Sequence, residues 1–181
     1  MVTMVEQPSV KKLVLIVMGR ASKCGRFMGI TRIQKLIYLL SITPEYKEIE
    51  NELRYQPLHY GPYSAEVSLA IDTLVEYKYI LSTPLKLETQ KLKNERGDEE
   101  SISEMAENKE YFETKEYRLS PVGSKVADHL YNSLSIKNRK VMDNIIKQYG
   151  GLELKELLRR VYAIAPDELL ARSTIRSQLG Y

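Results

Sequence analysis

Residues 53–64 read LRYQPLHYGPYS, a stretch that sets the direction of the chain between two regular segments. Pro57 and Pro62 fix φ and push the residues before them into extended geometry, while the glycine before the second proline permits a conformation that a side chain would oppose. Ser64 can cap the periodic segment that follows, AEVSLAIDTLVEYKY at residues 65–79. The stretch therefore predicts an extended segment that turns a corner into a helix.

The corner also carries three tyrosines and a histidine, namely Tyr55, Tyr60, Tyr63 and His59. In one interpretation, the rings cover the ends of neighbouring helices and keep their hydroxyls in water. In the other, the same rings and His59 form a recognition loop that contacts a peptide or a nucleotide base. The proline and glycine pattern favours the structural corner and keeps the recognition loop as its alternative.

Two helices are predicted before the corner. Ser9 can cap a helix over about residues 10–24, and Thr31 can cap a second one, RIQKLIYLLS, which ends before Pro44. The core face of the second helix repeats at the three-four spacing of a helix through Ile33, Leu36, Ile37 and Leu40. An acidic link joins this helix to the corner.

Short strands and further helices are predicted after the corner. ILSTPL and YRLSP are strand candidates on either side of a charged insertion at residues 84–115, so they can pair as the arms of a long hairpin. Ser120 and Pro121 mark the start of a helix. The helices predicted after it cover about 136–149, 152–164 and 166–179.

This order of elements predicts a fold class that is mainly α with a small β-sheet. It is typical of a winged-helix-like domain, here at residues 1–134, in which the charged insertion belongs to the wing. Residues 135–181 are predicted to form a C-terminal helical extension, and its helices offer a surface for a homodimer.

Composition narrows the classes of function. The chain has 181 residues, a net charge of +3 and one cysteine, Cys24, which cannot form an intramolecular disulfide or a cysteine-based metal site. The longest apolar run, LVLIVMG at residues 13–19, is much shorter than the roughly 20 residues of a membrane span. The start of the chain lacks the pattern of a secretory signal. We therefore expect a cytoplasmic protein that has no membrane partner.

No catalytic constellation is found in the sequence. His59 and His129 are the only histidines, and neither accompanies a nucleophile elbow or a metal-ligand spacing. Phosphate-binding glycine motifs are also missing. The sequence predicts a protein that is not an enzyme, with no catalytic residues, no metal and no cofactor.

Three motifs together resemble a known family. GITRIQKLIYLL, then YQPLHYGPYSAEVSLAIDTLVEYKYI, then a strand ending in YRLSPVG resemble the YwgA-like family of uncharacterised prokaryotic proteins. More distantly they resemble the SocA-like (Panacea) domain of antitoxins and phage-associated proteins. The resemblance covers about residues 10–133 and implies a winged-helix-like fold without known catalysis. For SocA-like domains it also implies antitoxin or adaptor activity through protein contacts. The long insertion and the helices after residue 134 depart from the pattern.

Charge gives a second indication of function. The outer face of the helix at 65–79 is acidic, with a net charge of −2 over Glu66, Ser68, Asp72, Thr73, Glu76 and Lys78, and would repel phosphates. Basic residues gather instead at the junction of the first two helices, at Arg20, Lys23, Arg26, Arg32 and Lys35. A second basic series comprises Lys137, Arg139, Lys140, Lys147, Arg159 and Arg160.

Two functions follow from these patterns. The first is a non-enzymatic DNA-binding regulator of winged-helix type, whose double-stranded DNA would contact the five basic residues at the helix junction. The alternative is a protein-interaction module, an antitoxin or adaptor, that uses the aromatic corner to contact a protein partner.

Overall fold

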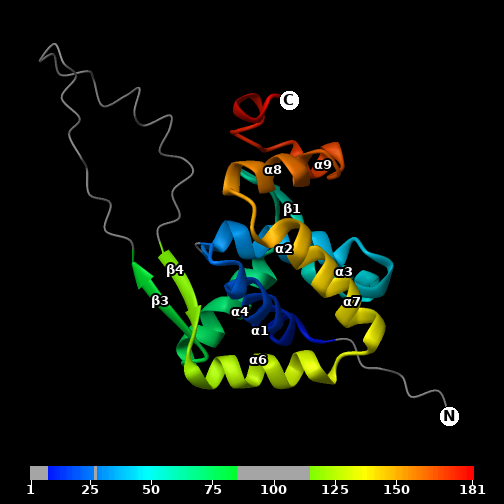
Figure 1. Ribbon diagram of the computed structural model, residues 1–181. Coiled ribbons are helices and arrows are strands. Elements are labelled where there is room, and N and C mark those ends of the chain that lie inside the picture. Colours follow the sequence, from blue (N-terminus) through cyan, green and yellow to red (C-terminus); the bar gives the residue numbers. More distant parts are fainter. Residues whose placement is uncertain (1–7, 27, 85–114) are drawn as a thin grey trace, which may run out of the picture.

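The computed structural model describes residues 8–26, 28–84 and 115–181 of the chain. The described part is mainly helical, as predicted, and its strands form two small antiparallel hairpins instead of one sheet (Figure 1). Its α-helices are α1 (Val10–Ala21), α2 (Ile30–Ser41), α3 (Lys47–Leu53), α4 (Ala65–Glu76), α6 (Pro121–Ser133), α7 (Ile136–Ile145), α8 (Leu154–Tyr162) and α9 (Asp167–Leu170). Its strands are β1 (Gln56–Leu58), β2 (Gly61–Tyr63), β3 (Ile80–Pro84) and β4 (Lys115–Leu119).

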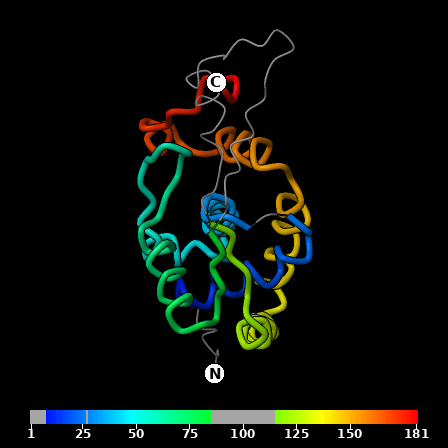
Figure 2. The backbone as a smooth tube through the Cα atoms, turned by 90° about the vertical axis from the view of Figure 1, so that its left-hand side faces the viewer, coloured from blue at the N-terminus to red at the C-terminus, as the bar shows by residue number. Residues whose placement is uncertain are grey.

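Helix α2 lies at the centre of the molecule. Figure 2 looks along its axis and shows the other helices and the β1–β2 hairpin arranged around it. Every residue from Thr31 to Ser41 is buried, and the four predicted core residues of this helix are fully buried. The sequence predicted one apolar face, but the helix is enclosed on all sides. Its polar side chains must therefore find hydrogen-bond partners inside the protein.

Helix α1 supplies a buried apolar run, from Leu13 to Met18. It packs against α2, α4 and α6, so these helices cover its apolar side chains. Within the described ranges, none of the helices has the length and apolar character needed to cross a bilayer.

Strands β3 and β4 pair as the predicted hairpin arms. Ile80 lies opposite Leu119, and Pro84 lies opposite Lys115. The sequence between these strands, which carries the predicted charged insertion, falls almost entirely outside the described residues. The predicted helix start after β4 is confirmed, because the Ser120 hydroxyl accepts a hydrogen bond from Gly123 N at 3.0 Å.

Position 123 requires a glycine, because the backbone of Tyr79 lies too close to leave room for a side chain. A Cβ atom at this position would lie 2.0 Å from the carbonyl oxygen of Tyr79. The same carbonyl accepts a hydrogen bond from Ser120 N at 2.9 Å. The SPVG segment therefore joins the start of α6 to the turn between α4 and β3.

Three predicted boundaries are wrong. Residues 47–52, predicted as an acidic link, and Leu53, predicted to open the extended segment, form α3, because Tyr46, Ile49 and Leu53 are buried at helical spacing. Helix α2 begins at Ile30, so its cap position is Gly29 and not Thr31. The last helix, predicted over 166–179, contains only Asp167–Leu170 as α-helix and a short 3₁₀ turn at Ser177–Leu179.

The C-terminal helices share the main core. Leu134, Met142 of α7, and Leu157 and Val161 of α8 pack in the same cluster as α1 and α2, so one core crosses the predicted boundary after residue 134. A second, smaller cluster covers the β1–β2 hairpin. Its members are Leu158, Tyr162, Leu170, Ile175 and Leu179, with Tyr60 packed against them.

Candidate functional site

The GPYS corner is fastened to α2 by two buried polar side chains. The Gln34 amide donates from Nε2 to the Ser64 carbonyl at 2.8 Å and accepts from Ser64 N at 3.0 Å through Oε1. Lys35 Nζ donates to the Pro62 carbonyl at 2.7 Å. Ser64 Oγ in turn accepts from Val67 N at 3.1 Å and caps α4. These bonds fix the direction in which α4 leaves the corner. Sequence reasoning missed the role of Gln34.

Two aromatic residues of the corner are largely enclosed. The Tyr55 ring packs edge-on against Tyr38, with centroids 5.0 Å apart. The Tyr55 hydroxyl is buried and has no hydrogen bond of normal geometry within the described part of the chain. Burial raises the pKa of Tyr55 well above its usual value, although Ser41 opposes part of that rise. Tyr60 packs on the second cluster. The expectation that these hydroxyls stay in water is therefore wrong for Tyr55.

The remaining corner residues are more exposed. His59 is exposed, and its carbonyl accepts a hydrogen bond from Thr174 N at 3.1 Å, while Tyr63 is half-buried. Gly61 has a positive φ of 82°, and a Cβ atom there would lie 2.9 Å from the Tyr162 ring. The hairpin is thus covered on one side by the C-terminal segment. These contacts match a structural corner more closely than an open recognition loop.

Arg26 and Arg32 hold the end of α7. This helix continues as a π-helical turn to Gly150. Arg32 donates to the Gly150 carbonyl at 3.2 Å, and Arg26 Nε donates to the Gly151 carbonyl at 2.8 Å. Arg26 also pairs with Glu153. Carbonyl groups at a helix C-terminus lack intrahelical donors and attract cations, so both arginines act as internal caps.

Arg20 belongs to a polar cluster between α1, α6 and α7. Its guanidinium lies 3.0 Å from Asp143 Oδ1 and stacks over the Tyr131 ring at 4.2 Å. The Tyr131 hydroxyl donates to Asp143 Oδ2 at 2.6 Å. Burial, followed by this hydrogen bond, raises the pKa of Tyr131. Arg20 therefore joins three helices.

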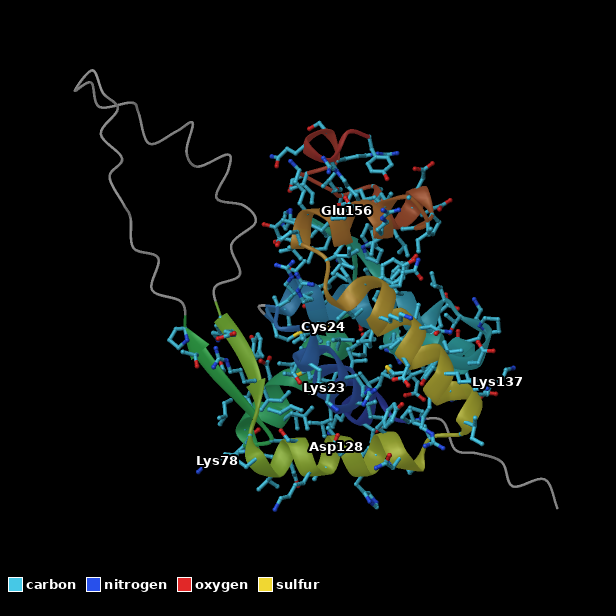
Figure 3. All side chains as sticks on the ribbon, in the orientation of Figure 1. Lys23, Cys24, Lys78, Asp128, Lys137 and Glu156 are labelled. Atoms are coloured by element: carbon cyan, nitrogen blue, oxygen red, sulfur yellow. The ribbon has the colours of Figure 1, made fainter. Side chains whose placement is uncertain are left out.

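The five basic residues predicted to bind nucleic acid do not form one surface. Arg32 and Lys35 are only 4% and 2% exposed, which corrects the expectation that they lie on a face open to phosphates. Arg20 and Arg26 are engaged in the contacts described above. Lys23 is exposed and forms no ion pair within the described ranges (Figure 3). Arg32 and Lys35 are buried because two segments that are distant in the sequence, β2 and the end of α7, cover this side of α2.

The second basic series is also divided. Lys137 pairs with Glu45 at 3.1 Å, and Arg159 and Arg160 both pair with Glu156 on α8. Lys140 is exposed on α7, and Lys147 is exposed on the π-helical turn that follows it. Figure 3 shows Lys137 and Glu156 on different parts of the molecule, so this series does not form a single stripe.

Helix α4 presents an exposed face that is both acidic and apolar. Its buried stripe contains Val67, Ala70, Ile71 and Leu74. On the opposite side, Leu69 is 67% exposed, and Asp72 and Glu76 are exposed without ion pairs among the described residues. Sequence reasoning missed Leu69. The available signal was its position two residues after Val67, which places it away from the core stripe.

The arrangement offers no metal centre in the part of the chain that the structure describes. Groups of three or more histidine, cysteine, aspartate or glutamate side chains close enough to hold a metal ion are not found there. His59 and His129 are both exposed.

Comparison with known proteins adds no relative. No family model matches the sequence, and a search of curated proteins finds no significant match.

Proposed function

We propose that this chain is a non-enzymatic protein-interaction module of the adaptor or antitoxin kind. The resemblance to SocA-like domains supports this class of function. We propose a winged-helix-like scaffold, which is supported by the β3–β4 hairpin that follows α4 directly and by the packing of α4 on α1. The interaction surface is the outer face of α4 and the turn after it, and not the basic junction of α1 and α2.

The observation that carries the proposal is the chemistry of α4. In a winged-helix protein that reads DNA, the helix before the wing enters the major groove. Here the exposed side of that helix carries Leu69 beside Asp72 and Glu76, two carboxylates that form no ion pair with the described residues. Phosphates would be repelled by those carboxylates, and apolar surface is what protein interfaces bury at their centre.

A second group of exposed apolar residues supports the same surface. Tyr77 is 69% exposed, Leu81 is 50% exposed and Val122 is 60% exposed. All three lie within two residues of Tyr79 or Ser120, which are joined by a backbone hydrogen bond. Exposed apolar side chains therefore gather near the C-terminal end of α4.

DNA binding is the second candidate, and one observation favours it. Lys78 and Lys115 are exposed at the base and at the far end of the β3–β4 hairpin, and neither is paired with a described residue. Figure 3 shows Lys78 at the edge of the molecule next to α4. A DNA complex that uses these residues would depend on the wing and not on α4.

One comparison separates the two functions. The purified chain is passed over heparin and titrated into labelled duplex DNA at low and moderate salt, and in parallel it is co-expressed with the product of a neighbouring gene. Protein interaction predicts co-purification of a stoichiometric complex and weak DNA binding. Duplex binding with a steep salt dependence and no complex would reverse the proposal. Sedimentation of the chain alone tests the homodimer expected from the C-terminal helices.

A further inference from the structure

The exposed stripe of α4 has a regular spacing. Ala65, Leu69, Asp72 and Glu76 follow one another at intervals of four, three and four residues and are all exposed. Residues with this spacing lie on one side of a helix. The buried stripe of the same helix lies opposite. A second helix could therefore lie along this stripe without disturbing the core.

The two carboxylates of the stripe are placed unfavourably for an isolated helix. Asp72 and Glu76 are four residues apart, and like charges at this spacing repel each other. Both lie in the last turns of α4, where the helix dipole disfavours negative charge. Neither has an ion-pair partner in the described part of the chain. Glu66, in contrast, lies in the first turn and is 3.8 Å from Arg54.

We infer that this stripe is the docking site for a basic amphipathic helix of a protein partner. The inference rests on the proposed function and names the chemistry of the partner. Apolar side chains of the incoming helix cover Leu69 and approach Tyr77, while its lysines or arginines pair with Asp72 and Glu76. Charge complementarity selects this occupant, because a basic helix removes the repulsion between the two carboxylates.

The test uses defined peptides. A labelled helical peptide of about 18 residues, which spans roughly 27 Å and exceeds the length of α4, carries a leucine stripe flanked by lysines. Two control peptides are matched to it. One has every lysine replaced by glutamate, and the other has the same composition in a scrambled order that removes the stripe. Each is titrated into the full chain and followed by fluorescence anisotropy.

Three variants of the chain locate the site. Leu69→Ser removes the apolar contact, and Asp72→Lys combined with Glu76→Lys reverses the charge. Asp128→Lys is the matched control, because Asp128 is an exposed carboxylate on α6 (Figure 3). We expect the lysine peptide to bind the wild type, and to bind the first two variants at least about tenfold more weakly while Asp128→Lys has little effect. The glutamate and scrambled peptides should bind weakly throughout.

Three binding results would overturn the inference. The lysine peptide could bind all variants with the same affinity as the wild type, the glutamate peptide could bind the wild type as tightly as the lysine peptide, or the lysine peptide could fail to bind the wild type. Self-association of the wild type that Leu69→Ser abolishes would also overturn it, since the occupant would then be a second copy of the chain. If the neighbouring gene product forms a complex that the α4 variants do not weaken, the chain is still a protein-interaction module, but the assignment of its surface to α4 and this inference are both wrong.

Discussion

Gln34 and Ser64 exchange two hydrogen bonds, in which the side-chain amide of Gln34 pairs with both backbone groups of Ser64. The pair lies inside the protein, since Gln34 is 2% exposed and Ser64 is fully buried. The Gln34 side chain thus supplies the hydrogen bonds that a neighbouring strand would supply to the backbone in a β-sheet. The motifs KLIYLL and YGPYS are therefore physically connected, because Gln34, which precedes the first motif, binds Ser64, the last residue of the second.

Substitution of Gln34 by alanine should destabilise the fold. The change leaves the buried Ser64 N–H without its partner, while the Ser64 carbonyl keeps the hydrogen bond from Ser68 N at 3.3 Å. One unsatisfied buried group costs about 1–3 kcal/mol, so we expect the free energy of unfolding to fall by about 1–3 kcal/mol in urea denaturation. Gln178→Ala, at an exposed position, is the control and should change it by less than about 0.5 kcal/mol. Equal effects of the two substitutions would contradict the role of Gln34.

Charge reversal on α2 should unfold the chain before it tests DNA binding. Arg32→Glu and Lys35→Glu each place an unpaired negative charge next to a backbone carbonyl in the interior. Breaking a buried charged contact costs about 3–5 kcal/mol. Circular dichroism should show loss of helix or a much lower melting temperature for either variant. Lys23→Glu should keep the wild-type melting temperature, and a stable, fully folded Arg32→Glu variant would show that this side chain is not buried in solution.

Gly123→Ala should be strongly destabilising, whereas Gly151→Ala should not be. A methyl group on residue 123 would overlap the Tyr79 carbonyl, but one on residue 151 meets no atom within 4 Å. Forcing the backbone apart costs about 1–3 kcal/mol or more. Thermal melts of the two variants measure the difference directly. Similar melting temperatures would mean that α6 does not start against Tyr79.

Buried tyrosines should make the fold sensitive to alkali. Burial raises the pKa of Tyr55 and, with smaller contributions from Asp143, that of Tyr46. A raised pKa in the folded state means that the unfolded chain loses these protons first. The contribution to stability is therefore complete below about pH 10 and is lost as the pH rises above it, by up to about 1.4 kcal/mol per pH unit for each tyrosine.

Tyr55→Phe provides the matched test of this pH dependence. The phenylalanine variant should lose less stability than the wild type between pH 9 and about pH 11, because it lacks one ionisable hydroxyl. At pH 7 its stability should differ little, since the Tyr55 hydroxyl has no regular hydrogen bond to lose. Tyr77→Phe, which changes a mostly exposed ring, should follow the wild-type curve. An unchanged slope for Tyr55→Phe would mean that water reaches its hydroxyl.

Local signals in the sequence predicted much of the fold. The serines at positions 64 and 120 were recognised as caps, and the structure shows both side-chain hydrogen bonds. The paired arms at 80–84 and 115–119 followed from two β-rich segments on either side of a charged run. Such signals depend on neighbouring residues, so they can be read without knowing the tertiary contacts.

The candidate site was harder to predict, because burial depends on contacts between distant segments. Arg32 and Lys35 read as a solvent-facing pair on a helix, yet their partners are carbonyls 118 and 27 residues away. A helix enclosed on all sides has no polar face, so its basic residues become internal donors. Leu69 is a different case, since its spacing from Val67 places it outside the core stripe, but only the tertiary structure shows that no described segment covers it.

The central claim is that the chain binds a protein through α4. Isothermal titration of the purified wild type and the Leu69→Ser variant with the neighbouring gene product tests it most directly. The account predicts saturable binding to the wild type and at least about tenfold weaker binding to the variant. Absence of binding to the wild type, together with salt-dependent binding of duplex DNA by the same preparation, would contradict it.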